Sequence, residues 1–315
     1  MVLGMLLAIT LPVLTNIKTL AQTPSATFQC TEVELKKYIQ QLDEGVPDAF
    51  NSLVECNSQA VPTLIKTLRA TQNEDTRIII IAALGEIGSE AASIIPVLSE
   101  LLKDENKDVR VIAIHSLSQM GKEAIPALIS SLKDENVRFR AIDILGKFGK
   151  EAVPALISVL DNPDSNVRDS AAIALGRMGV EAKEAIPALI SALNAPNPDP
   201  GSIVLFSTDY AADVLVRIGT EAIPALISAL DDLDSNIRYS AAIALGRMGA
   251  EAKAAIPALI SALDDPDSNV RYGAAIALGR MGAEAKAAIP ALISALDDPD
   301  SNVRYGAAIA LGRMG

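Results

Sequence analysis

The side chains that could do chemistry in this 315-residue chain are few. It contains one histidine, His115, and two cysteines, Cys30 and Cys56. Zinc sites and Cys/His nucleophilic pairs need several such residues at one point, and residues this scarce do not supply them. We therefore predict no catalytic residue, no cofactor and no metal ligand.

Clusters of aspartates offer a second kind of chemistry, because carboxylates bind calcium. Asp264, Asp265 and Asp267 lie close together, but their segment lacks the central glycine and the terminal glutamate of a calcium-binding loop. Aspartate is also a preferred residue at the N-terminus of a helix. We therefore expect helix caps and solvated turns here rather than a calcium site.

An arginine recurs after each acidic turn. A repeated Arg–Asp pair could in principle be catalytic, but we favour a structural ladder, in which each arginine pairs with a capping aspartate or with a carbonyl group of an adjacent unit. The arginines are Arg77, Arg110, Arg138, Arg168, Arg238, Arg271 and Arg304, and the acids that precede them include Asp164, Asp234, Asp267 and Asp300.

These residues belong to an internal repeat. Residues 256–282 recur without a change as residues 289–315. Pro257 has counterparts along most of the chain, at a spacing of roughly 33 residues, which is typical of a helical solenoid. These counterparts are Pro62, Pro96, Pro126, Pro154, Pro187, Pro224 and Pro290.

Each repeat predicts two helices. The first has apolar residues at the spacing of one helix face, at Ile256, Leu259, Ile260 and Leu263. Asp267 is a candidate N-cap for a second helix over Ser268–Met281, which ends at Gly282. Ala275 and Gly279 keep one face of this second helix small, so the next repeat can approach closely.

The repeated residues resemble a known family. The segments Ile-Pro-Ala-Leu-Ile, Asp-Pro-Asp-Ser-Asn-Val-Arg and Ala-Ala-Ile-Ala-Leu-Gly-Arg-Met-Gly are similar to HEAT repeats, specifically to the HEAT-like repeats of phycobilisome lyases. The resemblance covers about residues 59–315. It implies an all-α fold, an α-solenoid wound as a right-handed superhelix of about eight helical hairpins, whose second helices line a concave surface.

This resemblance leaves the function open. Similar repeats occur in bilin lyases, phycobilisome degradation factors, deoxyhypusine hydroxylases and many scaffolds. His115 is followed by Ser116 rather than glutamate, so the His-Glu pairs that the hydroxylases need are missing and that activity is excluded. Two hypotheses remain: a non-enzymatic scaffold that binds a protein or peptide on its concave face, and a bilin lyase or phycobilisome-associated assembly or degradation factor.

Packing leaves three positions of each second helix free, four residues apart. Along the array these positions are apolar at first, acidic in the middle, and occupied by Tyr, Ile and Arg at the end. Tyrosine and arginine are enriched in protein-binding hot spots. Recent copying of identical repeats would account for the same ladder equally well. The predicted partner-binding residues are Tyr239, Ile243, Arg247, Tyr272, Ile276, Arg280, Tyr305, Ile309 and Arg313.

The N-terminal region lies outside the repeats. Residues 1–21 are largely apolar and end in Thr19-Leu20-Ala21, which is typical of a secretory signal peptide, although no Lys or Arg precedes the apolar run. The alternative is a short membrane anchor. Residues 22–58 predict a helical cap before the array at 59–315, with a capping box at Thr31 and Glu34 and an apolar side that includes Val33.

Two antiparallel helices in this cap would bring Cys30 and Cys56 together, so we predict a disulfide, with two unrelated buried thiols as the alternative. Export to a periplasm, a thylakoid lumen or the extracellular space follows from the signal peptide. No integral membrane span is expected after cleavage.

Composition restricts the partners. The formal net charge of −12 argues against a nucleic acid, because binding to phosphates needs a positive surface. We expect a protein or peptide partner. The Pro-rich insertion at residues 194–201 predicts either a docking loop or a tolerated insertion. Leu311 and Met314 border an apolar face, which predicts end-to-end self-association or a chain that continues.

Overall fold

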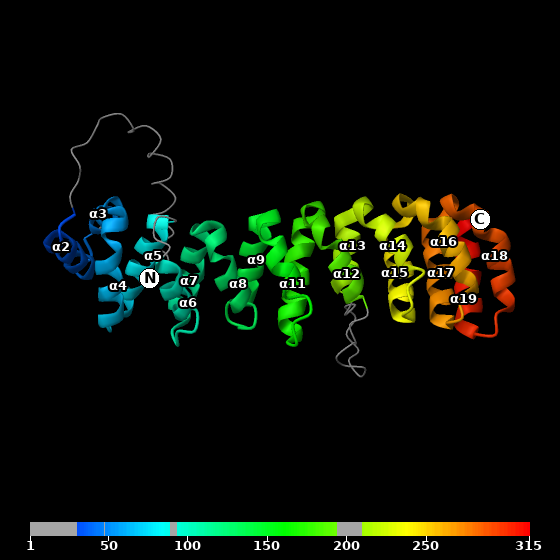
Figure 1. The fold of residues 1–315 in the computed structure, drawn as a ribbon, viewed down its shortest axis with the longest axis horizontal. Helices are drawn as coiled ribbons and strands as arrows, with labels where there is room; N and C mark the ends of the chain where they lie inside the picture. The colour runs from blue at the N-terminus through cyan, green and yellow to red at the C-terminus, as the bar shows by residue number, and fades with distance from the viewer. Residues whose placement is uncertain (1–29, 47, 89–92, 194–209) are drawn as a thin grey trace, which may run out of the picture. The chain divides into compact units, whose positions relative to one another are not determined.

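The computed structural model describes residues 30–46, 48–88, 93–193 and 210–315. Over these residues every regular element is helical and none is a strand. They fall into two compact units, Met1–Ala127 and Leu128–Gly315 (Figure 1). In both units consecutive helices form pairs that stack on the next pair, so the predicted α-solenoid is confirmed. The predicted signal peptide and the Pro-rich insertion lie outside the described residues.

The first unit is built from the N-terminal helices. Helices α2 and α3 pack together, α4 packs on α5, α6 packs on α7, and α5 lies beside α7. Helix α8 (Ile125–Ser131) runs across the boundary to the second unit. The helices of the first unit are α2 (Glu32–Asp43), α3 (Asp48–Glu55), α4 (Val61–Ala70), α5 (Glu74–Ile87), α6 (Ile94–Leu101) and α7 (Lys107–Gln119).

The N-terminal cap of this unit is closed covalently. Cys30, just before α2, and Cys56, just after α3, form the predicted disulfide, with their Cα atoms 5.6 Å apart. The predicted capping box is present, since Thr31 and Glu34 bond reciprocally. The prediction for Val33 was wrong, because its side chain is 78% exposed. At about 100° per residue, Val33 lies roughly opposite the buried Leu35 on the helix.

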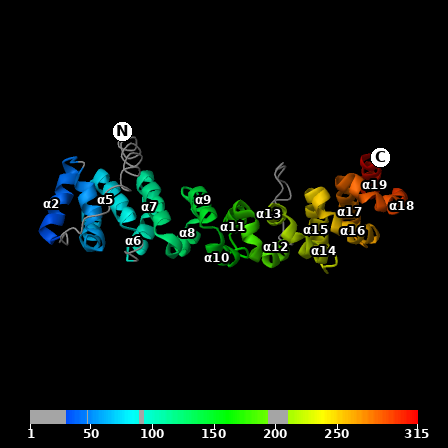
Figure 2. The same ribbon diagram turned by 90° about the horizontal axis from the view of Figure 1, so that it is seen from above.

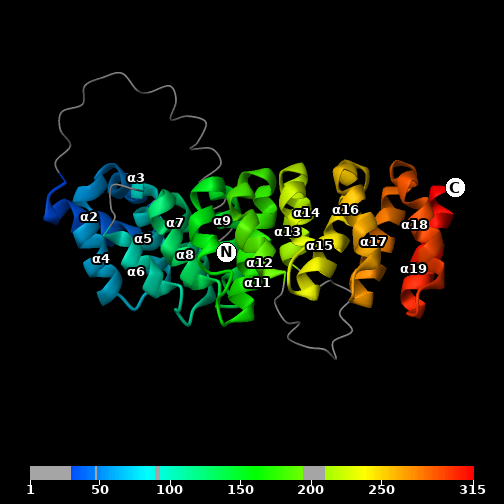
Figure 3. The same ribbon diagram turned by 45° about the vertical axis from the view of Figure 1, so that its right-hand side comes forward.

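The second unit repeats one pattern. Its second helices, α9 to α19 in odd numbers, pack side by side in chain order, and each first helix packs on the second helix that follows it (Figures 2 and 3). The helices are α9 (Arg138–Phe148), α10 (Val153–Ile157), α11 (Ser165–Met178), α12 (Ile186–Ala192), α13 (Tyr210–Ile218), α14 (Ile223–Ala229), α15 (Ser235–Met248), α16 (Ile256–Ser261), α17 (Ser268–Met281), α18 (Ile289–Ser294) and α19 (Ser301–Met314).

The first helix of a repeat is shorter than its apolar spacing predicts. Helix α16 ends at Ser261 and a 3₁₀ turn over Ala262–Asp264 follows. A 3₁₀ turn advances about 120° per residue instead of 100°. Ala262 in this turn is buried, whereas Ile260, which lies in the last turn of α16, is only half-buried.

The second helix has the predicted bounds. The Oδ1 atom of Asp267 accepts a hydrogen bond from the backbone N–H of Asn269 at 2.8 Å and caps the helix, which ends at Gly282 with φ of 59°. A positive φ favours glycine, so the break between repeats is encoded locally.

The second helices meet at a seam made of small residues. A Cβ atom built on Gly246 of α15 would lie 2.6 Å from the Cα of Ala277 in α17, and one on Gly279 of α17 would lie 2.8 Å from the Cα of Ala310 in α19. Real Cβ atoms do not approach so closely, so these glycines let the backbones of consecutive repeats touch.

Candidate functional site

The recurrent arginine of the acidic turn lies in the seam between repeats. Arg238 holds Asp265 of the next repeat through two hydrogen bonds, from Nε at 2.7 Å and from Nη2 at 2.9 Å. Arg271 holds Asp298 in the same way, at 2.7 and 3.0 Å. These four side chains are 9–14% exposed, so the pairs are nearly buried. We call Arg238 and Arg271 the seam arginines.

The seam arginines differ from the prediction in two details. Their aspartate lies two residues before the capping aspartate of the next repeat, because the cap itself is occupied by a backbone N–H. The carbonyl groups they bind belong to their own turn and not to an adjacent unit: Arg271 Nη1, for example, donates to the carbonyl oxygens of Asp265 and Pro266.

The other arginines at this position of the repeat have different partners from one repeat to the next. Arg77 pairs with Asp104 in the first unit. Arg138 donates to the carbonyl oxygens of Leu132 and Lys133, and Asn162 stands where the next repeat would need an aspartate. Arg110, Arg168 and Arg304 likewise bind carbonyl oxygens of their own turns.

The seam pairs shift the titration of their carboxylates. Burial by itself raises the pKa of Asp265, but the hydrogen bonds from Arg238 and from the amide of Asp267 outweigh it and hold the pKa below its ordinary value. The hydrogen bond from Arg271 is the largest influence on Asp298 and lowers its pKa. Each pair is therefore fully charged at neutral pH.

The predicted partner-binding residues lie on the exposed face of α15, α17 and α19, which we call the Tyr/Ile/Arg face. The rings of Tyr239 and Tyr272 lie over Gly273 and Gly306 of the next repeat, where an added Cβ would come within 3.0 and 3.1 Å of the ring. These two tyrosines are half-buried, whereas Tyr305 is 63% exposed. The tyrosines therefore contribute to packing between repeats as well as to the surface.

The isoleucines and arginines complete this face. Ile243, Ile276 and Ile309 are partly exposed, and Arg247, Arg280 and Arg313 are exposed.

A second set of ion pairs crosses the exposed face, and it follows one rule. Arg177 pairs with Asp143 of the preceding repeat, and Arg247 pairs with Asp213 of the preceding repeat, with Nη1 and Oδ1 2.5 Å apart in the second case. Where the preceding repeat carries isoleucine at that position, the arginine has no carboxylate among the described residues. These cases are Arg217 after Ile173, Arg280 after Ile243, and Arg313 after Ile276.

Comparison with known proteins identifies the repeat. The sequence model described as HEAT repeats matches residues 61–138, 125–202 and 256–315. The chain belongs to the HEAT-repeat family. Within this HEAT array, the model described as the PBS lyase HEAT-like repeat matches residues 209–232 and 237–265. A search of curated protein sequences found no match.

Solved structures share the HEAT architecture. Kap121p aligns with a TM-score of 0.54 at 16% sequence identity, covering 92% of this chain and 40% of that one. Kap121p bound to the SUMO protease Ulp1p aligns with a TM-score of 0.57 at 16% identity, covering 89% of this chain and 37% of that one. This chain thus spans about two fifths of the length of the Kap121p chains that it matches, and the likeness is one of fold.

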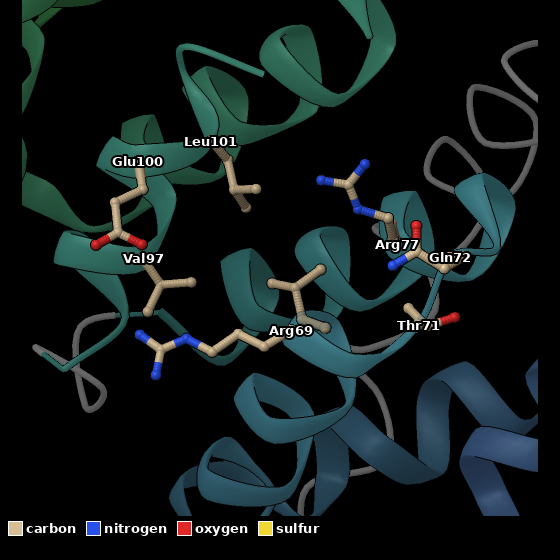
Figure 4. Close-up of a pocket in the computed structure, with 8 residues that line it drawn as sticks. Arg69, Thr71, Gln72, Arg77, Val97, Glu100 and Leu101 are labelled. Atoms are coloured by element: carbon tan, nitrogen blue, oxygen red, sulfur yellow. The ribbon is translucent and has the colours of Figure 1, made fainter. Parts of the chain in front are cut away.

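A cavity of about 290 Å³ lies between α4 and α6 in the first unit, and Figure 4 shows Arg69, Arg77, Val97 and Glu100 around it. The guanidinium group of Arg77 forms an ion pair with the Asp104 carboxylate. The lining contains no histidine or cysteine.

His115 and Ser116 lie on α7. His115 is exposed on α7 and lies 3.3 Å from the side-chain amide of Gln119. Ser116 is buried and donates to the carbonyl oxygen of Ile81 in α5, so it joins two repeats. Among the described residues no group of His, Cys, Asp and Glu side chains could hold a metal ion. No helix in the described ranges is long and apolar enough to cross a membrane.

Proposed function

We propose that this HEAT array is a non-catalytic scaffold that holds a protein or peptide on its Tyr/Ile/Arg face. The observation that carries the proposal is the exposure of Arg280 and Arg313, neither of which has a carboxylate partner among the described residues. Arginine and tyrosine bury much area on binding while keeping a polar group for the partner.

The fold is compatible with this role. Kap121p has been solved bound to Nup53p and to Ulp1p, so a HEAT solenoid of similar architecture does hold other proteins. A shared fold is a weak argument for a shared activity, and the residues of the face therefore carry the proposal.

We place the scaffold outside the cytoplasm. The Cys30–Cys56 disulfide supports this location, because disulfides persist in oxidising compartments. A fusion of residues 1–30 to a periplasmic or secreted reporter tests it, and retention of the reporter inside the cell would argue against export.

Crosslinking capture tests the scaffold itself. Replacing Tyr239, Tyr272 and Tyr305 with alanine should lower recovery of the partner at least severalfold. A matched control replaces the exposed Glu251 and Glu284, which lie in the links between repeats, with alanine. Circular dichroism of both variants separates loss of binding from loss of packing. Unchanged recovery with the tyrosine variant would remove the Tyr/Ile/Arg face from the binding site.

A second candidate function is that of a bilin lyase or phycobilisome-associated factor. The match of residues 209–232 and 237–265 to the PBS lyase HEAT-like repeat favours it. Incubating the protein with a free bilin and an acceptor phycobiliprotein subunit would show attachment as a shift in the visible absorption of the bilin. Attachment above the uncatalysed rate would replace the scaffold proposal with this one.

A further inference from the structure

Two ion pairs within the chain show which chemical group the exposed arginines bind. In two places on the exposed face the arginine of one repeat pairs with an aspartate of the preceding repeat, Arg177 with Asp143 and Arg247 with Asp213. The same position of the preceding repeat is isoleucine before Arg280 and Arg313. These two guanidinium groups thus occupy a setting that elsewhere in the protein holds a carboxylate.

We propose that Arg280 and Arg313 bind an acidic segment of a partner protein, whose carboxylates take the places that Asp143 and Asp213 occupy beside Arg177 and Arg247. This inference rests on the proposed scaffold function and specifies the chemistry of its partner. The net charge of the whole chain is −12, so attraction for an anionic peptide has to come from these two arginines at short range.

The repeat spacing sets the spacing of the ligand's carboxylates. Arg280 and Arg313 lie on α17 and α19, which pack directly against each other. Packed helices lie about 8–10 Å apart, and a polyproline II segment advances about 3.1 Å per residue with three residues per turn, so two carboxylates three residues apart lie on one side of such a segment, about 9 Å from each other.

The surroundings of the arginines favour an apolar residue between these carboxylates. Ile276 and Ile309 present partly exposed aliphatic surface on the same two helices, about one turn from the arginines. The occupant we infer is therefore an extended acidic peptide with an apolar side chain between two aspartates or glutamates.

Fluorescence anisotropy with two labelled peptides tests the inference. One peptide carries aspartate at its third and sixth positions with leucine between them, and the other carries asparagine at both positions. We expect the aspartate peptide to bind about tenfold or more tightly, because charged pairs at an interface discriminate strongly. Equal affinity for the two peptides would overturn the inference.

A variant that supplies its own carboxylates sharpens the test. Ile243→Asp with Ile276→Asp copies the arrangement of Asp213 beside Arg247, and these aspartates should occupy Arg280 and Arg313. We expect about a tenfold loss of affinity for the aspartate peptide, and a smaller loss in the matched variant Ile243→Asn with Ile276→Asn. Equal losses in the two variants would show that only apolar surface matters.

A third variant guards against misfolding. Arg280→Glu with Arg313→Glu changes only exposed side chains, and it should invert the preference, so that a peptide with lysine at the third and sixth positions binds more tightly than the aspartate peptide. Failure to invert would overturn the inference. If crosslinking still captures a partner through the tyrosines, the scaffold function stands while the acidic ligand falls.

Discussion

The helices α15, α17 and α19 carry arginines on two sides, and the arginines on these two sides have different partners. On the seam side, Arg238 and Arg271 are nearly buried and each receives an aspartate from the next repeat. On the exposed side, Arg247 receives an aspartate from the preceding repeat, whereas Arg280 and Arg313 receive none within the described residues.

This difference reflects two requirements: charges in the seam need a partner for stability, whereas charges on the exposed face are stabilised by water. A nearly buried charge without a partner is strongly destabilising, so Asp265 and Asp298 depend on Arg238 and Arg271 once they are present in the seam. An exposed arginine is solvated, so the exposed side tolerates either aspartate or isoleucine at the facing position. Only the exposed side is therefore free to be used for a ligand.

The largest effect should come from breaking a seam pair. Arg271→Ala leaves Asp298 nearly buried without its partner, and removal of one member of such a pair costs about 3 kcal/mol or more of unfolding free energy. Urea unfolding followed by circular dichroism measures the loss, and hydrogen exchange locates it at α17 and α19.

Arg304→Ala is the matched control for this prediction. Arg304 stands at the same position of its repeat but binds only carbonyl oxygens of its own turn, so we expect a loss of about 1 kcal/mol or less. Equal losses for Arg271→Ala and Arg304→Ala would contradict the distinction between the paired and the unpaired positions of the seam.

The next effect in size concerns the glycines of the seam. Gly279→Ala places a Cβ atom 2.8 Å from the Cα of Ala310, so the two helices must separate, at a cost of about 1–3 kcal/mol. Gly312 occupies the same position in α19 and has no atom within 4 Å of an added Cβ. Gly312→Ala should be neutral or slightly stabilising, because alanine favours helix. Equal melting temperatures for the two variants would mean that α17 and α19 are not in close contact at Gly279.

The smallest effect concerns acid. The pKa values of Asp265 and Asp298 are lowered from 3.8, so their pairs contribute stability above the unfolded pKa, and this contribution is lost as the pH falls through the lower folded values. Burial raises the pKa of Asp169 on α11, so its contribution to stability has the opposite pH dependence.

Asp298→Asn provides the comparison for this titration. We expect the stability difference between the wild-type protein and this variant to shrink as the pH falls below about 4, as measured by urea midpoints. A difference that stays constant from pH 7 to the acid range would show that the Asp298 charge contributes nothing.

Local features of the fold could be predicted from the sequence. The bounds of α17 follow from Asp267, which caps it, and from Gly282, which ends it, and both residues act within a few positions of themselves. The Cys30–Cys56 pair could be predicted because a short helical hairpin brings its ends together.

Features that depend on how repeats dock could not be predicted. The pairing of Arg271 with Asp298, and not with a capping aspartate, depends on the offset between consecutive repeats. The pairing of Arg247 with Asp213 also needs that offset, although the alternation of aspartate and isoleucine at this position was visible in the sequence. The place of the Tyr272 ring over Gly306 has the same origin.

The identical seams have a consequence for the evolution of the molecule. Gly246 meets Ala277 in the same manner as Gly279 meets Ala310, so one whole repeat could be gained or lost without creating a new kind of contact. Each such event would add or remove one exposed arginine. Affinity for an extended ligand with regularly spaced charges would then rise or fall stepwise with the number of repeats. The change would come from avidity alone, without any change in a single binding site.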